Sequence, residues 1–196
     1  MTAVTSPFTE PSRCKRLKAA SSRDHDSVDQ LVMAARPFEN RERYGRFLQV
    51  QHRFHGSLLA LYQDEQLNQQ LPGLAALSRF AAVEADLRDL GLSLPTSTQP
   101  VCVSSAQALG WLYCSEGSNL GAAFLYKHTQ RLGLEGDKGA RHLAPHPDGR
   151  ALHWRAFVAR LDSLVLGDQE EAEVVKGAIA AFDSYRRHLR EVFAGL

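Results

Sequence analysis

The stretch that decides the fold class of this chain is SSAQALGWLYCSEGSNLGAAFLYKHTQRL, residues 104–132. Its apolar residues recur at the three- to four-residue spacing of one helix face: Leu109, Leu112, Tyr113, Leu120, Phe124 and Leu125. The middle is poor helix-forming material, because two glycines, a serine and an asparagine fall within residues 117–121. A glycine in a helix interior costs about 0.5–1 kcal/mol relative to alanine. The sequence therefore predicts one long helix that carries its glycines for a reason.

Two reasons account for Gly117 and Gly121. A neighbouring helix can pack closely against the glycine face, or a flat ligand can lie directly on bare backbone. Glycine also permits a kink in a long helix. This stretch alone does not choose between packing and a ligand.

Composition bounds the remaining possibilities. The chain has 196 residues, is 44% hydrophobic and 23% charged, and so resembles a soluble globular protein with a sizeable core. Its net charge of +1 leaves no broad basic field, so no nucleic-acid partner is expected. No apolar run approaches the ~18–20 residues of a membrane span, so no membrane partner is expected either.

The N-terminus and the cysteines indicate a cytoplasmic protein. Residues 1–12 are polar, contain two prolines and lack the apolar core of a signal peptide, so we expect a mobile tail there. Cys14, Cys102 and Cys114 form an odd set without CxxC spacing. That usage fits a reducing compartment and indicates neither a zinc site nor a disulfide framework.

Helical patterns extend over the rest of the chain, and no segment shows the sustained alternation of a strand. Asn40 is the predicted N-cap of the second helix. We expect an all-α, single-domain fold over residues 13–196, with about six to eight helices. The expected helices cover residues 13–35, 40–63, 64–70, 74–90, 104–132, 150–166 and 168–194, with a Pro/Ser/Thr linker at 93–100 and a loop at 133–149.

His25 and Asp29 are the residues whose spacing best fits a metal site. They lie four apart in the first predicted helix and therefore on one face. A carboxylate that accepts from imidazole Nδ1–H fixes the tautomer and leaves Nε2 as a metal ligand. The alternative is a surface pair on a charged helix, and spacing alone favours that alternative.

The other candidate residues give weaker evidence for a catalytic or metal site. His52 and His55 are expected on a helix surface, and His142, His146 and His153 are expected to be exposed in or beside a loop. Ser115 lacks a nucleophile-elbow context, and the chain has neither a P-loop nor a GxGxxG motif. A di-iron bundle would need repeated Glu-x-x-His, which the sequence lacks.

Two blocks of sequence carry a resemblance to a known family. The first is LKAA at 17–20, followed by HDSVD at 25–29. The second is LGWLY at 109–113, running into EGSNLGAA at 116–123. Together with the segment 133–143, which ends in GARHL, these blocks resemble the haem oxygenases, and most of all the bacterial branch that includes the Pseudomonas and Neisseria enzymes.

The resemblance spans residues 13–194 and implies a helical bundle with haem between the first helix and a glycine-kinked distal helix. It implies His25 as the proximal iron ligand, Asp29 as the hydrogen-bond partner of His25, and Lys18 as a propionate contact. Mammalian relatives have an Asp on the distal helix that orders water, and the matching region here has polar side chains of another kind. The implied pocket and catalytic residues are Tyr113, Gly117, Ser118, Asn119 and Gly121.

The activity implied is O₂-dependent cleavage of haem b, as substrate and prosthetic group, to biliverdin, CO and Fe²⁺. Electrons would come from a ferredoxin- or flavoprotein-type reductant, because the chain has no flavin or NAD fingerprint. The biliverdin would serve iron release or supply a bacteriophytochrome. With Lys18 as the propionate anchor, and Met33 and His128 rather than lysines at the far edge (although Lys127 adjoins the latter), the expected product is the IXα isomer.

Two alternatives remain at this point. One is a haem carrier or sensor of the same helical fold that holds the iron without turnover. The other is an enzyme of the same general fold acting on thiamine-like compounds, which needs a catalytic cysteine in a polar pocket. Cys114 lies in an apolar stretch and is more typical of a core residue.

Overall fold

The computed structural model describes residues 12–95 and 98–195, and helices are its regular secondary structure. The predicted all-α fold is therefore confirmed. Apart from Ser12, the tail expected at residues 1–12 lies outside the described residues, as does part of the linker. The α-helices are α1 (Arg13–Ala35), α2 (Arg41–Gln63), α3 (Glu65–Gln70), α4 (Phe80–Asp89), α5 (Ser105–Thr129), α6 (Arg150–Ser163) and α7 (Asp168–Val192). Short 3₁₀ turns lie at Leu74–Leu77 (η1), Gln130–Leu132 (η2) and Arg141–Leu143 (η3).

Local signals set the ends of the first two helices. The carbonyl of Met33 accepts from the backbone N–H of Arg36, which caps α1 in a left-handed conformation with φ of 46°. Pro37 follows directly and cannot continue the helix. The side chain of Asn40 then accepts from the N–H of Arg43 at 2.9 Å, which confirms Asn40 as the N-cap of α2.

The single helix expected over residues 74–90 is wrong, because the structure divides it. A 3₁₀ turn, η1, ends at Leu77, Ser78 is extended with ψ of 127°, and α4 begins at Phe80. Leu74 packs into one hydrophobic cluster, whereas Val83 and Leu87 pack into the other. The break allows the two apolar runs to face different parts of the core.

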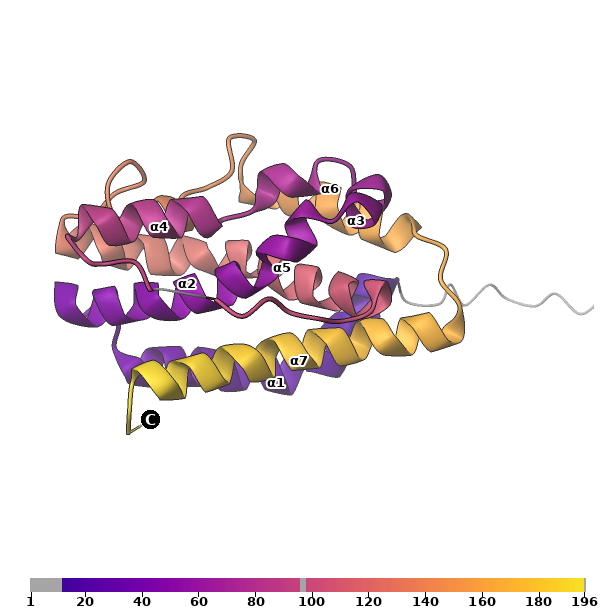
Figure 1. Cartoon of the computed structure of the whole chain (residues 1–196), viewed down its shortest axis with the longest axis horizontal. Helices are drawn as coiled ribbons and strands as arrows, with labels where there is room; N and C mark the ends of the chain where they lie inside the picture. The colour runs from indigo at the N-terminus through magenta and orange to yellow at the C-terminus, as the bar shows by residue number, and fades with distance from the viewer. Residues whose placement is uncertain (1–11, 96–97, 196) are drawn as a thin grey trace, which may run out of the picture.

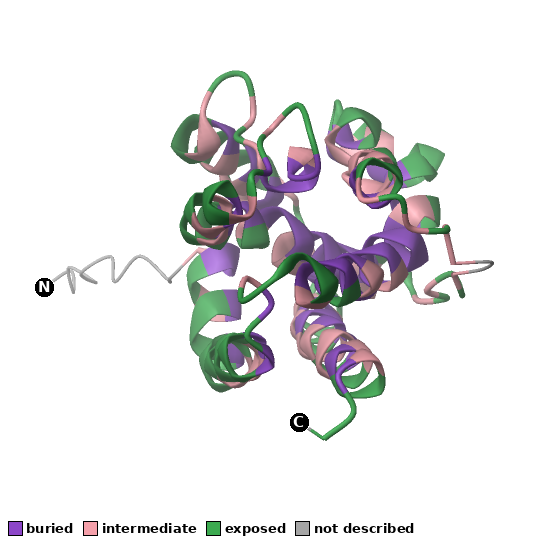
Figure 2. Cartoon of the chain, turned by 90° about the vertical axis from the view of Figure 1, so that its left-hand side faces the viewer, coloured by how far each residue is buried: buried purple, intermediate pink, exposed green. Residues whose placement is uncertain are grey.

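The helices stack in layers (Figure 1). α1 and α7 run side by side along one edge, α2 and α5 lie in the middle, and α3, α4 and α6 cover the opposite side. Buried residues gather where these layers meet, and the exposed ones face outward (Figure 2). Within the described residues, no helix is long and apolar enough to cross a membrane.

The contact between α5 and α7 is the closest part of this stack. A Cβ added at Gly110 would lie under 3.0 Å from the carbonyl oxygen of Val174, and one added at Gly177 would lie as close to the backbone of Gln107. The two backbones therefore touch at these glycines. α7 packs against α1 as well, so it fixes the positions of both helices that carry the predicted site.

Candidate functional site

The predicted proximal residues lie on one exposed face of α1. The side chain of His25 is 59% exposed, and its Nδ1 lies 3.4 Å from Asp29 Oδ2 and 3.7 Å from Asp26 Oδ1. The ring meets the edge of Phe182 from α7 at 6.0 Å. With Nδ1 directed at carboxylates, Nε2 is the nitrogen that an external ligand meets. Lys18 is exposed two turns earlier on the same helix.

The predicted distal glycines lie on a stripe of α5 that continues to Phe124 and His128, at helical intervals of four, three and four residues. A Cβ added at Gly121 would meet nothing within 4 Å, and one at Gly117 would meet only the ring of Trp154, at 3.4 Å. A tightly packed neighbouring helix therefore does not explain Gly121. α5 runs through this segment without interruption, and neither glycine has a positive φ.

α1 and α5 both contribute to one groove that lies beyond His25 and Gly121, which do not themselves line it. Its volume is about 220 Å³, and Met33 of α1 and His128 of α5 both line it, with Phe38 stacked on His128 at 5.6 Å. Met33 and Phe124 are 52% and 55% exposed, which is unusual for large apolar side chains. Bare backbone beside exposed apolar side chains fits a flat, largely apolar ligand.

The remaining predicted site residues are not all on this face. Tyr113 is half-buried against Trp154 at 5.6 Å, and burial raises its pKa to about 12, so the phenol is neutral. Ser118 is exposed and donates to the carbonyl of Ser115 at 2.7 Å. Asn119 is buried and directs its amide toward Glu116 Oε2 at 3.4 Å, away from the glycine stripe.

The expected exposure of most of the other histidines is wrong. His52, His55, His142 and His153 are each less than 9% exposed. The first two lie on α2, which packs against α4, α5 and α7 and is therefore buried on most of its faces. Burial lowers the pKa of His55 to about 3, with help from His142 and Arg79, so its ring is neutral.

A buried carboxylate behind the glycine stripe is the feature that the sequence reasoning missed. Glu116 is 1% exposed, accepts from Tyr62 Oη at 2.5 Å, and lies 2.8 Å from His153 Nε2. The signal was its register, because Glu116 falls one turn after the core residue Leu112. A charged residue on a predicted apolar face indicates a buried polar contact.

Other chemistries find less support at these positions. Burial raises the pKa of the Cys114 thiol, which donates to the carbonyl of Ala178 at 3.5 Å, so it is a poor nucleophile. This environment argues against the thiamine-like alternative. In the part of the chain that the structure describes, no three His, Cys, Asp or Glu side chains converge to hold a metal ion by themselves.

Comparisons with known proteins identify the family of the chain. The haem oxygenase family model matches residues 12–191. Haem oxygenase PigA of Pseudomonas aeruginosa is 43% identical over 185 residues, which cover 93% of each chain. The NO- and CO-bound haem oxygenase of Neisseria meningitidis superimposes with a TM-score of 0.88 at 48% identity, covering 94% of this chain and 95% of the other.

A more distant relative extends the likeness in fold. The haem oxygenase of Leptospira interrogans superimposes with a TM-score of 0.75 at 18% identity, covering 92% of this chain and all of the other. At that identity the match concerns the fold alone. With the family match and the two closer relatives, the chain belongs to the haem oxygenase family, enzymes that degrade haem as their substrate with electrons from an external donor.

Proposed function

We propose that residues 13–196 form one haem oxygenase domain that binds haem b between α1 and α5, with His25 Nε2 as the proximal iron ligand. The observation that carries this proposal is the pair of open faces. The half-exposed ring of His25 stands on α1, the space beside Gly121 is open on α5, and both helices border the groove at Met33 and His128. A haem that activates O₂ needs one axial protein ligand and an open position on the other side.

Asp29 sets the chemistry of the proximal ligand. A carboxylate 3.4 Å from His25 Nδ1 is placed to accept a hydrogen bond from Nδ1–H, which would fix the ring orientation and make Nε2 a stronger ligand. Phe182 confines the ring from the side of α7. These contacts orient the ring so that Nε2 faces away from α1, toward the proposed haem.

The distal face contributes neither a bulky side chain nor a charged group at Gly117 and Gly121. Bound haem supplies the iron at which O₂ is activated, and the products are biliverdin, CO and Fe²⁺. Gly117 and Gly121 allow the helix to approach the ring plane, while Phe124 and Met33 exclude water from its edge. Ser118 is the exposed hydroxyl nearest this face in sequence and is the side chain that orders water for proton transfer, with Asn119 supporting the segment from behind.

Lys18 determines which edge of the haem faces outward. Its ammonium lies two turns before His25, where it reaches a propionate. A charge-assisted bond contributes about 1.5–3 kcal/mol when partly shielded, and about 1.4 kcal/mol suffices for a tenfold bias. The far edge of the groove has Met33 and His128 rather than lysines, and Arg36, which also lines the groove, is paired with Glu39 at 3.5 Å. The proposed product is therefore the IXα isomer.

Partners and location follow from the chemistry. A ferredoxin- or flavoprotein-type reductant supplies the electrons, because the chain has no cofactor fingerprint of its own. The biliverdin serves iron acquisition or becomes the chromophore of a bacteriophytochrome. Cys14, Cys102 and Cys114 are free thiols, which suits the cytoplasm.

The test is an absorption spectrum of the haem complex before and after reductant is added in air. Loss of the Soret band with growth of a biliverdin band supports the enzyme, whereas a stable Soret band supports the carrier or sensor. Chromatography of the product against isomer standards then tests Lys18. A dominant β or δ isomer contradicts the assigned propionate contact.

A further inference from the structure

Glu116 lies directly before Gly117, and its side chain points to a different side of α5. Successive residues of a helix are turned by about 100°, so Glu116 and Asn119 point inward while Gly117 and Gly121 point toward the haem. The carboxylate is almost fully buried, at 1% exposed. Besides Asn119 on α5 itself, its contacts come from two other helices, since Tyr62 belongs to α2 and His153 to α6.

These contacts hold one short segment of α5 from behind. Tyr62 Oη donates to Glu116 Oε1 at 2.5 Å and lies 2.8 Å from Ser115 Oγ. His153 Nε2 lies 2.8 Å from Glu116 Oε2, and Arg150 Nη1 donates to the carbonyl of Asn119 at 2.9 Å. α6 therefore contacts the segment at Glu116 and at Asn119, on either side of Gly117.

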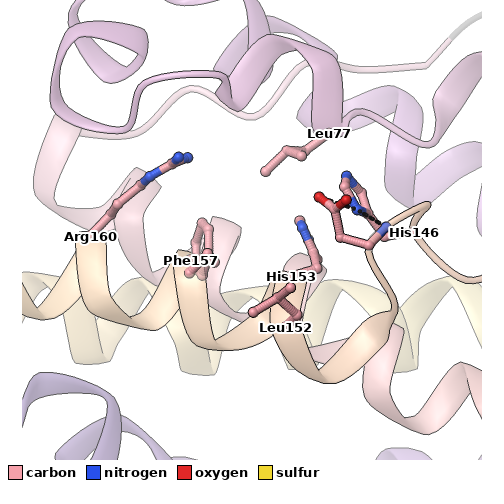
Figure 3. Close-up of a pocket in the computed structure, with 8 residues that line it drawn as sticks. Leu77, His146, Leu152, His153, Phe157 and Arg160 are labelled. Atoms are coloured by element: carbon pink, nitrogen blue, oxygen red, sulfur yellow. Dashed lines mark hydrogen bonds and ion pairs between the residues drawn. The ribbon is translucent and has the colours of Figure 1, made fainter.

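The ring of His153 is itself confined. Its outer face stacks on His146 at 4.5 Å with an interplanar angle of 17°, and both rings border a cavity of about 160 Å³ (Figure 3). In that view His153, Phe157 and Arg160 extend from one face of α6 toward Leu77. This packing leaves Nε2 directed at Glu116.

Stability alone does not explain a buried carboxylate at this position. Replacing a buried ion pair by well-packed apolar residues is often neutral or stabilising. Polar groups retained in a core fix one arrangement among several in some proteins. The contact with α7 at Gly110 lies about two turns before Gly117, and the glycine segment itself has no side chains whose packing would set its local rotation.

We infer that Glu116 is a positioning residue for the haem reaction, whose contacts with Tyr62 and His153 fix the rotation of α5 so that Gly117 and Gly121 face the haem. This inference rests on the proposed function. It assigns Glu116 no contact with haem or O₂. The role of Glu116 is to set the position of the backbone of residues 117–121 relative to the haem ring.

Two variants at the same position test it. Glu116→Leu fills the space but removes the contacts with Tyr62 and His153, and we expect an apoprotein that folds but melts below wild type, because two buried polar side chains each lose a partner. Its kcat falls about tenfold to a hundredfold with little change in KM for haem, as expected when a reacting group is misplaced by about 1 Å. Glu116→Gln keeps most of kcat, because the amide has the size of the carboxylate and its oxygen still accepts from Tyr62.

A matched control separates positioning from general packing. Gln107 Nε2 donates to Glu173 at 2.6 Å and links α5 to α7 far from the glycine stripe, so Gln107→Leu should leave kcat unchanged. In the apoprotein, amide hydrogen exchange at residues 117–121 should accelerate about tenfold in Glu116→Leu and not in Gln107→Leu. The rate of CO dissociation from the ferrous haem complex should also change only in Glu116→Leu.

Several results would overturn the inference. They are wild-type kcat in Glu116→Leu, an equal loss in Gln107→Leu, or a Glu116→Gln variant as impaired as Glu116→Leu. If Glu116→Leu does not fold, Tyr62→Phe is the second variant, because it removes only one hydroxyl. Wild-type kcat and wild-type amide exchange in Tyr62→Phe would also overturn the inference. Wild-type protein that binds haem without turnover would instead contradict the proposed function, and it is measured in the same series.

Discussion

Gly110 and Gly121 lie on the same face of α5, about three turns apart, and their surroundings are opposite. A Cβ at Gly110 would lie under 3.0 Å from the backbone of α7, whereas a Cβ at Gly121 would meet nothing within 4 Å. α7 packs against the first part of the face and leaves the second part open. One helix thus uses glycine both to bring two backbones together and to leave space for a ligand.

The difference shows why a glycine-rich helix is ambiguous as a sequence. Both explanations considered for the glycines are present in α5, but at different positions. Packing explains Gly110 and its counterpart Gly177. Open space beside exposed Phe124 explains Gly121, and only the neighbours of each residue decide between the two.

The largest effect is expected for Gly121→Leu. Its side chain enters the space assigned to haem and O₂, so haem binding or turnover should fall about tenfold or more, the equivalent of ~1–3 kcal/mol of overpacking. The apoprotein should melt near wild type, because a Cβ at this position meets no protein atom within 4 Å. Haem titration and calorimetry measure both quantities.

Ala123→Leu is the matched control, since residue 123 is exposed on α5 but outside the stripe. It should retain haem binding. A Gly121→Leu apoprotein that unfolds would support helix packing at Gly121 and remove the contrast with Gly110.

Gly110→Ala should have the next largest effect, and it should act on stability. The added methyl group collides with the backbone of Val174 and Ala178, which are parts of α7 that no rotamer change can move aside. We expect a loss of about 1–3 kcal/mol in the free energy of unfolding, visible as a lower Tm in thermal denaturation. Haem affinity of the folded protein should not change, and a variant as stable as wild type would contradict the close approach of α5 and α7.

Gly121→Ala should have the smallest effect, with the opposite sign. A methyl group at this position meets no neighbour, and alanine favours a helix over glycine by about 0.5–1 kcal/mol. The apoprotein should therefore gain stability in urea denaturation. A loss comparable to that of Gly110→Ala would show that the two glycines have the same role.

Local signals in the sequence predicted much of the fold. The cap at Asn40, the stop before Pro37 and the apolar spacing of residues 104–132 each act within one helix, and the structure has helices there. The division of residues 74–90 was not predicted. It depends on which of two hydrophobic clusters each leucine joins, and that is a property of the assembled core.

In the site, too, local patterns were predicted and contacts between distant segments were not. The spacing of His25 and Asp29 predicted a shared face, and the two side chains do lie together. The burial of His52 and His55 was missed because α2 is surrounded by other helices, which no local pattern reveals. Glu116 was missed for a related reason, since its partners Tyr62 and His153 are 54 and 37 residues away in the chain.

The most direct test of the account is the absorption spectrum and aerobic turnover of His25→Ala, with and without added imidazole. If His25 ligates the iron opposite the glycine stripe, the variant loses turnover, and imidazole partly restores a six-coordinate type of spectrum by occupying the vacated position. A variant that keeps the wild-type haem spectrum and wild-type turnover would contradict the assignment of His25, and with it the placement of haem between α1 and α5.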